Sequence, residues 1–164
     1  MINLKKKNPT YKDVTCCKRW LCFANFLEDF EILKNEYNWN VDEKLQLDKD
    51  ILHKGDKIYS LENCVLVPSW INLLFTKRDT KRGVYPIGVR YHKQRKKYEA
   101  RCSINGKKIG LGYYSTIKEA FNAYKQAKEQ EIKRVADECV SKGYITKDGR
   151  LYNAMINYQV EIDD

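Results

Sequence analysis

The sequence predicts an α+β fold, and three observations lead to this prediction. Near the N-terminus, aromatic and aliphatic residues recur at three- and four-residue steps, as they do along one face of a helix. The dipeptide Asn105-Gly106 stands between two extended stretches, which is the pattern of a β-hairpin. A helix start signal follows this pattern at residues 115 and 116.

The chain has 164 residues, which is enough for one ordinary domain or for two to three small modules. Its local composition favours modules, because charged and apolar residues are unevenly distributed. We expect a first α+β module, a basic linker, a three-stranded antiparallel sheet packed on a helix, and a helical C-terminal extension. These parts span residues 1–76, 77–84, 85–137 and 138–164, in that order.

The first expected element is a helix over residues 18–37. Its apolar residues make one face, and we expect that face to lie in the core. They are Trp20, Phe23, Phe26, Leu27 and Phe30.

Short strands are expected next. Residues 45–57 predict a strand, a turn at Gly55-Asp56 and a second short strand. Residues 64–67 are an apolar strand, and Pro68 with Ser69 marks the start of a helix that continues to residue 75.

The sheet module follows the linker. Residues 84–91 alternate weakly, residues 97–104 alternate well, and residues 107–114 resume an extended pattern after the Asn105-Gly106 turn. Three antiparallel strands are therefore predicted. Within the middle strand, Tyr98, Ala100, Cys102 and Ile104 share one face, whereas Lys97, Glu99, Arg101 and Ser103 share the other. Packing a helix on the first face leaves a basic face exposed.

The helix that packs on this sheet is expected to begin at Ser115 or Thr116. Glu119 stands three residues after Thr116 and completes a capping box. The helix continues to about residue 140 and breaks at Gly143, and a second short helix is expected over residues 151–158. The apolar positions of the long helix are Ala120, Tyr124, Ala127, Ile132, Val135 and Ala136.

Positive charge is concentrated in one segment. Residues 76–114 contain twelve lysines and arginines but only two acidic residues, whereas the whole chain has a net charge of +9. Neutralising phosphates releases counterions, and tyrosines, which are also frequent in this segment, can stack on sugars and bases. This segment therefore indicates a nucleic-acid partner, with a solvated charged surface as the alternative.

Membrane insertion and a zinc site are not expected. No run approaches the roughly 20 apolar residues that span a bilayer, so we expect a soluble, intracellular protein. The six cysteines have no paired CxxC spacing, and only His53 and His92 could supply imidazole ligands. We expect reduced and mostly buried thiols.

The sheet module resembles a known DNA-binding domain. Its Gly88-Val89-Arg90, its Lys97-Tyr98-Glu99-Ala100-Arg101 and its stretch from Gly106 to Thr116 are similar to the ethylene-response-factor (Apetala) type domain of plant regulators, which phage homing endonucleases also carry. The resemblance implies that a three-stranded sheet reads the DNA major groove through Arg90, Tyr98, Arg101 and Lys108. Gly110 stands where plant members have a groove-contacting tryptophan, and Ser103 where they have an arginine, so their sequence preference is not transferred. With the other basic residues, the candidate DNA-binding set is Arg90, Lys93, Arg95, Lys96, Tyr98, Arg101, Lys107 and Lys108.

The first module is similar to the HNH-type nuclease half of phage homing endonucleases. The resemblance rests on the stretches 20–26, 47–52, 59–68 and 71–75. It implies a ββα module in which two strands and a helix hold one divalent ion, here Mg²⁺. The implied catalytic residues are Asp48, Lys49, Asp50, Asn63 and Asn72, and the implied metal ligands are Asp48, Asp50 and Asn72.

Lys49 stands where that family has the histidine that acts as general base. A lysine has a reference pKa of about 10.4 and is protonated at neutral pH, so it cannot accept a proton. Lys49 would instead contact phosphate or stabilise charge, while a metal-bound water acts as the nucleophile. His53 is expected in a turn rather than as a displaced base. These residues also have structural alternatives: Asp48 and Asp50 as a turn pair, Asn63 as a cap or turn residue, and Asn72 as an amide on a helix surface.

Together the two resemblances imply a phage-type homing endonuclease that cuts double-stranded DNA with Mg²⁺ in the cytoplasm of a bacterial host, in association with the nucleoid. The alternative is a non-catalytic nucleic-acid-binding protein of phage origin, either a regulator or an inhibitor with a protein partner in a DNA-handling complex. A third class, an RNA- or ribosome-associated protein, shares the charge signature but not the resemblances.

Overall fold

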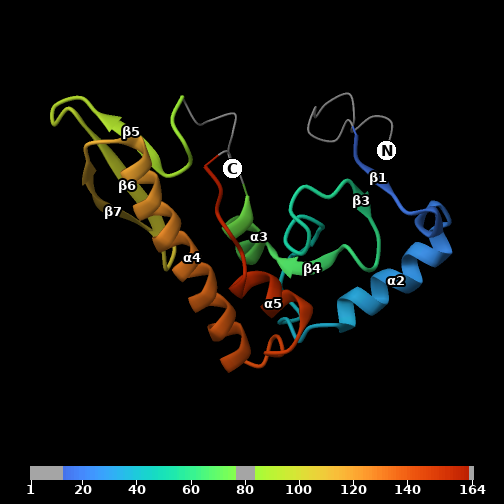
Figure 1. Cartoon of the computed structure of the whole chain (residues 1–164). Helices are drawn as coiled ribbons and strands as arrows, with labels where there is room; N and C mark the ends of the chain where they lie inside the picture. The colour runs from blue at the N-terminus through green and yellow to red at the C-terminus, as the bar shows by residue number, and fades with distance from the viewer. Residues whose placement is uncertain (1–12, 77–83, 163–164) are drawn as a thin grey trace. The chain divides into compact units, whose positions relative to one another are not determined.

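The computed structural model describes residues 13–76 and 84–162 and has an α+β fold (Figure 1). The chain divides into two compact units. The N-terminal unit contains Met1–Phe75 and Gly143–Leu151, and the sheet unit contains Thr76–Lys142 and Tyr152–Asp164. The linker expected over residues 77–84 lies outside the described residues except for Val84.

In its described residues before residue 76, the N-terminal unit has short strands and three helical segments. Its elements are β1 (Thr15–Cys16), the 3-10 helix η2 (Lys18–Leu21), α2 (Phe23–Asn35), β2 (Leu45–Asp48), β3 (Ile58–Tyr59), β4 (Val65–Pro68) and α3 (Ser69–Phe75). Strand β4 is buried along its whole length, and α3 follows it directly. The predicted helix start at Ser69 is therefore confirmed.

The helix α2 packs with a narrower face than the sequence predicts. Phe26, Phe30 and Leu33 recur at steps of four and three residues and pack in the core, and Leu33 is fully buried. The expectation that Phe23 and Leu27 are also core residues is wrong, because their exposed fractions are 73% and 47%. Leu27 lies about 100° around the helix from Phe26, off the buried stripe, and Phe23 lies at the first residue of the helix.

The pairing of the short strands also differs from the expectation. Strand β2 pairs with β4 in antiparallel register, with Asp48 opposite Val65, whereas β3 pairs with β1 in parallel. The two strands and the turn at Gly55-Asp56 are present, since the Asp56 N–H donates to the His53 carbonyl and Gly55 has a φ of 80°, but the two strands do not pair with each other. The chain also turns earlier, because Asp48 Oδ1 accepts hydrogen bonds from the backbone N–H groups of Asp50 and Ile51, at 2.8 and 2.9 Å.

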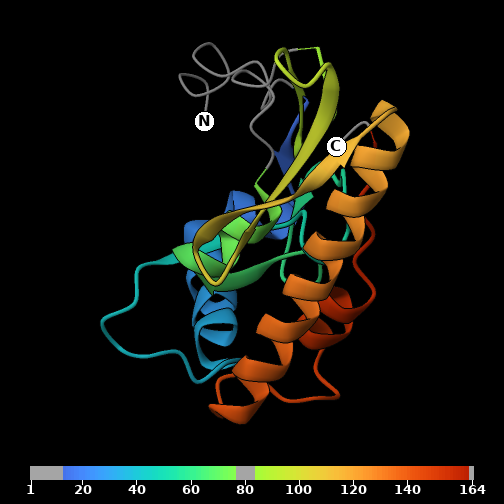
Figure 2. The same ribbon diagram turned by 90° about the vertical axis from the view of Figure 1, so that its left-hand side faces the viewer.

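The sheet unit has the predicted three antiparallel strands in the order β5-β6-β7. They are β5 (Val89–His92), β6 (Lys97–Ile104) and β7 (Lys107–Tyr114), and the helix α4 (Ile117–Ser141) packs along them (Figure 2). The last helix, α5 (Arg150–Ile156), begins close to the predicted position. Its first two residues belong to the N-terminal unit and the rest to the sheet unit.

Local signals in the sheet unit act as predicted. Asn105 and Gly106 both have positive φ, 51° and 73°, as the tight turn between β6 and β7 requires. Thr116 Oγ1 accepts from the Glu119 N–H and Glu119 Oε2 accepts from the Thr116 N–H, which completes the capping box of α4. Gly143 has a φ of 71° just after the end of α4.

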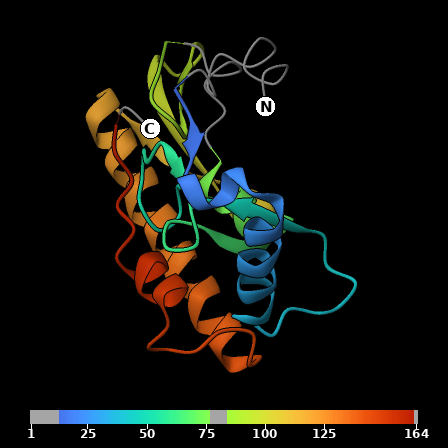
Figure 3. The same ribbon diagram turned by 90° about the vertical axis from the view of Figure 1, so that its right-hand side faces the viewer.

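The core of the sheet unit lies between α4 and one face of the sheet. Ala100, Cys102, Ala120, Phe121 and Tyr124 are buried there. The segment after α5 runs back along α4 (Figure 3), and its Val160 enters the same core. Lys125 Nζ donates to the Val160 carbonyl at 2.8 Å, and the Val160 N–H donates to Glu129 Oε1 at 2.9 Å.

Candidate nucleic-acid interface and candidate nuclease site

One face of the β5–β7 sheet is turned away from α4. Tyr98, Ala100, Cys102 and Ile104 pack toward α4, so the alternate residues of β6 lie on the opposite face. We call this opposite face the open face. By register it consists of Arg90 and His92 of β5, Lys97, Glu99, Arg101 and Ser103 of β6, and Lys108, Gly110 and Tyr113 of β7.

A β-bulge keeps apolar residues off the open face. Ala100 pairs with Gly112 and Arg101 pairs with Gly110, so Leu111 is an extra residue on β7. Leu111 packs against the core, and Gly110 lies beside Arg101 instead. The bulge therefore leaves a residue without a side chain next to the basic centre of the face.

That centre is an ion-paired cluster of three side chains. Arg90 Nε binds Glu99 Oε2, and Arg101 Nε lies 3.7 Å from Glu99 Oε1. The Glu99 side chain is 8% exposed, whereas those of Arg90 and Arg101 are 54% and 42% exposed. Two guanidinium groups therefore cover one buried carboxylate and remain accessible themselves.

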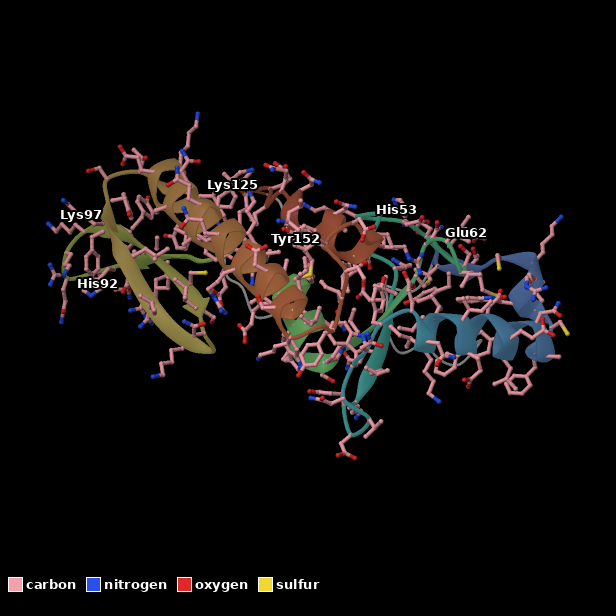
Figure 4. The ribbon with its side chains drawn as sticks, turned by 90° about the horizontal axis from the view of Figure 1, so that it is seen from below. His53, Glu62, His92, Lys97, Lys125 and Tyr152 are labelled. Carbon is pink, nitrogen blue, oxygen red and sulfur yellow. The ribbon has the colours of Figure 1, made fainter. Side chains whose placement is uncertain are left out.

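An aromatic and cationic group lies at the end of the sheet near the β5–β6 turn. His92 pairs with Lys97 across the strands, and Figure 4 shows both at the same end of the sheet. The His92 and Tyr113 rings meet edge to face at 5.2 Å, and the Arg95 guanidinium lies 4.5 Å from the Tyr113 ring centre. Stacking on Tyr113 holds Arg95 in one orientation at the edge of the open face.

The structure brings together most of the candidate DNA-binding residues. Arg90, Arg101 and Lys108 lie on the open face, Lys93, Arg95 and Lys96 lie in the exposed turn before β6, and Lys107 begins β7. Tyr98 lies on the other face, where its ring packs between those of Tyr85 and Tyr91 at 5.7 and 5.3 Å. The basic residues Lys77, Arg78, Lys81 and Arg82 lie outside the described residues.

Six residues of the open face were not in the candidate set: His92, Lys97, Glu99, Ser103, Gly110 and Tyr113. The alternation of β6 places Glu99 beside Lys97 and Arg101, so this signal was present in the sequence. The position of Tyr113 depends on the bulge at Leu111, for which the sequence has no comparable signal.

The candidate nuclease residues lie around the end of β2. Asp48 is half-buried, and its Oδ1 caps the turn that follows. Burial raises the pKa of the Asp48 carboxyl above its ordinary value of 3.8, although the hydrogen bonds from Ile51 and Asp50 act in the opposite direction. Asp48 Oδ1 holds the backbone of residues 50 and 51 in the turn through these two hydrogen bonds.

Lys49 is placed inward. It is 6% exposed, its Nζ donates to Asp50 Oδ1 at 2.8 Å, and it lies 5.8 Å from the centre of the Tyr59 ring. Asp50 Oδ1 also accepts from the Gly55 N–H at 3.2 Å. The buried ammonium group therefore pairs with the exposed carboxylate of Asp50, and a phosphate that contacted Lys49 would have to displace this pair.

The two asparagines lie in different surroundings. Asn63 Nδ2 donates to Asp56 Oδ2 at 2.8 Å, which ties the loop before β4 to the loop before β3. Asn72 Nδ2, on α3, donates at 2.6 Å to Oε1 of Gln46, which is two residues before Asp48 on β2. Gln46 and Asp48 share a face of β2, so Asn72 lies on the same side of the strand as Asp48.

His53 lies in the turn between β2 and β3, as expected (Figure 4). Its carbonyl accepts from the Asp56 N–H at 3.0 Å, and its side chain is exposed. Among residues 13–76 and 84–162, no group of three or more His, Cys, Asp or Glu side chains is placed to hold a metal ion. Asp48 and Asp50 have the oxygen donors that Mg²⁺ prefers, but an oxygen of each is bonded within its own loop.

The cysteines are free thiols at six separate positions. Cys64, Cys102 and Cys139 are buried, Cys16 and Cys17 are half-buried, and Cys22 is exposed. Burial raises the pKa of Cys64 and of Cys139 to about 11. These two thiols are therefore protonated at neutral pH and are poor nucleophiles.

No protein-family model, no curated protein and no solved structure matches this chain. In the parts of the chain that the structure describes, no helix combines the length and the apolar character needed to cross a membrane.

Proposed function

We propose that this protein binds double-stranded DNA through the open face of its β5–β7 sheet. The observation that carries the proposal is the pair of accessible guanidinium groups, Arg90 and Arg101, at the centre of a face that α4 leaves uncovered. Arginine forks match O6 and N7 of guanine, and the DNA major groove, about 12 Å wide, admits a β-ribbon.

The distribution of charge along the face supports this geometry. Lys93, Arg95 and Lys96 lie at one end of the strands, and Lys107 and Lys108 lie at the other. In a DNA groove the base edges lie in the middle and the phosphates form both rims. Cations at the two ends can contact phosphates while the central arginines face the bases.

A salt titration with variants tests this proposal. If about five cations contact phosphates, the logarithm of affinity for duplex DNA falls with the logarithm of salt concentration at a slope of roughly −4 to −5. Arg101→Ala weakens duplex binding at least tenfold, whereas Lys133→Ala, which removes the same charge from an exposed position on α4, changes it less than twofold. Equal losses in the two variants, no binding at low salt, or tighter binding to duplex RNA would contradict the proposal.

A second candidate function is Mg²⁺-dependent cleavage of double-stranded DNA, as in a homing endonuclease. Two observations favour it: β2 and β4 form an antiparallel pair and α3 follows β4 directly in the chain, and Asn72 lies on the same side of β2 as Asp48. Asp48, Asp50 and Asn72 would hold the ion, which would supply a bound water as nucleophile. Lys49, in place of a histidine base, would only stabilise charge.

Incubation with supercoiled plasmid, with Mg²⁺ and with chelator, tests this second function. Cleavage that Asp50→Ala abolishes without changing DNA affinity supports the endonuclease. Lys49→His then raises the rate, because imidazole titrates near neutral pH. An intact plasmid across Mg²⁺ and Mn²⁺ at several pH values, with DNA still bound, supports the non-catalytic alternative: a DNA-binding regulator, or an inhibitor with a protein partner in a DNA-handling complex.

A further inference from the structure

Glu99 is an acidic residue at the middle of the basic open face. It lies on the central strand, with Arg90 opposite it on β5 and Tyr113 opposite it on β7. Its side chain is 8% exposed, although α4 packs on the other face of the sheet. Both arginines pair with it. A carboxylate that faces a polyanion is unfavourable, unless it serves to position these two arginines.

Glu99 accepts a hydrogen bond from Arg90 Nε and forms an ion pair with Arg101 Nε. Arg90 Nε binds one carboxylate oxygen, and Arg101 Nε lies 3.7 Å from the other. A guanidinium group is planar and has a rigid fork of donors, so fixing Nε also fixes the direction of the Nη1–Nη2 edge. That edge is the one that matches the two acceptors of guanine.

The β7 residue opposite Arg101 has no side chain. It is Gly110, and a Cβ built on it would lie 3.7 Å from Glu99 Oε1. A side chain would fit beside the carboxylate at that distance, yet the position carries none. Position 110 therefore places no side chain beside Arg101 and the Glu99 carboxylate.

We propose that Glu99 is a positioning residue that determines sequence specificity, by holding Arg90 and Arg101 in the orientation that reads guanine and away from the phosphates. This inference rests on the proposed DNA binding. A phosphate that draws either arginine off Glu99 leaves a buried carboxylate without that partner, which is costly. A guanine that binds the outer edge leaves the Nε contact in place. Glu99 therefore lowers affinity for arbitrary DNA and preserves affinity for the preferred sequence.

The test compares Glu99→Gln with Glu138→Gln in the full-length protein. Glu138 lies on α4 and pairs with Arg134 and Lys142, so its replacement makes the same charge change away from the open face. Binding is measured on a random-sequence duplex and on a duplex selected by the wild-type protein from a random pool. Retention on a heparin column measures binding to a polyanion that has no bases.

Glu99→Gln is expected to bind the random duplex at least threefold more tightly than Glu138→Gln does, and to elute from heparin at higher salt. Its salt slope becomes steeper by up to about 2, one unit for each released arginine. Its preference for the selected duplex falls at least tenfold. Equal behaviour of the two variants overturns the inference while leaving DNA binding intact, whereas a wild-type protein that binds no duplex overturns both.

Arg90→Lys is a second variant, which leaves Glu99 in place. It tests the inference even if Glu99→Gln does not fold. Lysine keeps the charge but lacks the fork. Loss of preference for the selected duplex with unchanged binding to the random duplex supports the inference. A variant that keeps the full preference contradicts it.

Discussion

At the scale of single residues, Gly88 meets a backbone requirement and a packing requirement at once. Its φ is +77°, a conformation that residues with a Cβ rarely adopt, and it directly precedes β5. A Cβ at this position would lie 2.1 Å from Cδ2 of Tyr124, a buried residue of α4. The start of β5 therefore packs on the helix through its bare backbone.

Gly88→Ala should lower the free energy of unfolding by about 3 kcal/mol, through backbone strain and overpacking together. Gly106→Ala is the matched control, because Gly106 has a φ of +73° and nothing within 4 Å of its Cβ position. It should lose only about 1 kcal/mol. Urea unfolding followed by circular dichroism measures both, and equal losses would show that the Tyr124 contact is not what excludes a side chain.

Asp48 gives a pH-dependent prediction. Burial raises the pKa of this carboxyl, so the folded state binds the proton more readily than the unfolded chain does. The contribution of Asp48 to stability is therefore favourable while it is protonated and is lost as the pH rises above 3.8 through the raised pKa. Asp48→Asn keeps the oxygen that accepts from Asp50 and Ile51 and removes the charge.

Asp48→Asn should therefore be at least as stable as the wild type at pH 7, and Asp48→Ala should lose about 1 to 2 kcal/mol with its two hydrogen bonds. Urea titrations at pH 4 and pH 7 check this, since the advantage of Asp48→Asn over the wild type should be larger at pH 7. A loss at pH 7 as large as that of Asp48→Ala would mean that the carboxylate charge itself stabilises the loop.

The candidate nuclease residues show what a sequence reveals at this scale. Order and residue type identify Asp48, Lys49 and Asp50 as a set, but they do not give the direction of each side chain. Lys49 points inward because Asp50 and the Tyr59 ring, from a strand ten residues later, receive its ammonium group. The contact with Tyr59, a residue of another strand, is not visible in local spacing.

At the scale of elements, Glu131 links α4 to the hairpin between β6 and β7. Its Oε1 accepts from the Asn105 N–H at 2.8 Å, and Arg134 donates to both of its oxygens. The side chain is 4% exposed. The Arg134 guanidinium, with a smaller contribution from the Asn105 N–H, lowers the pKa of the Glu131 carboxyl below its ordinary value of 4.5.

Glu131→Ala should lower the free energy of unfolding by about 2 kcal/mol at pH 7, because it leaves a backbone donor and an arginine without their buried acceptor. A lowered pKa stabilises the fold above pH 4.5 and loses this effect as the pH falls through the lowered value. The difference from the wild type should therefore shrink below pH 4. Glu138→Ala, which removes a more exposed partner of the same arginine, is the control and should cost less than half as much.

Elements that depend on neighbouring residues were predictable, and those that depend on distant partners were not. The capping box at Thr116 and the turn at Asn105-Gly106 are set within four residues, and both formed as predicted. The pairing of β2 with β4 joins segments separated by the whole loop from residue 49 to residue 64. In that loop the local turn signal at Gly55-Asp56 was real but did not determine the strand partner.

At the scale of the whole molecule, the chain passes between the two units three times, after residues 75, 142 and 151. The return segment contributes Arg150 to the N-terminal unit, where it pairs with Glu36 and donates to the carbonyls of Leu61 and Glu62 at 3.0 and 2.9 Å. The final segment contributes Val160 to the core of the sheet unit. Each unit is therefore completed by residues from the C-terminal fifth of the chain.

Single substitutions in this C-terminal part should separate the two units. Arg150→Ala removes charged hydrogen bonds from the N-terminal unit and should cost it about 2 to 3 kcal/mol. Val160→Ala opens a cavity in the core of the sheet unit and should cost that unit roughly 2 kcal/mol. Val41→Ala, at a fully exposed position, is the control and should cost neither unit anything measurable.

The two effects can be observed independently because all three tryptophans, Trp20, Trp39 and Trp70, belong to the N-terminal unit. Tryptophan fluorescence therefore follows that unit, whereas far-UV circular dichroism is dominated by the 25-residue α4 of the sheet unit. Arg150→Ala should shift mainly the fluorescence transition in urea, and Val160→Ala mainly the dichroism transition. If both variants shift both transitions equally, the two units unfold as one cooperative block, and the C-terminal segments stabilise the molecule as a whole rather than each unit separately.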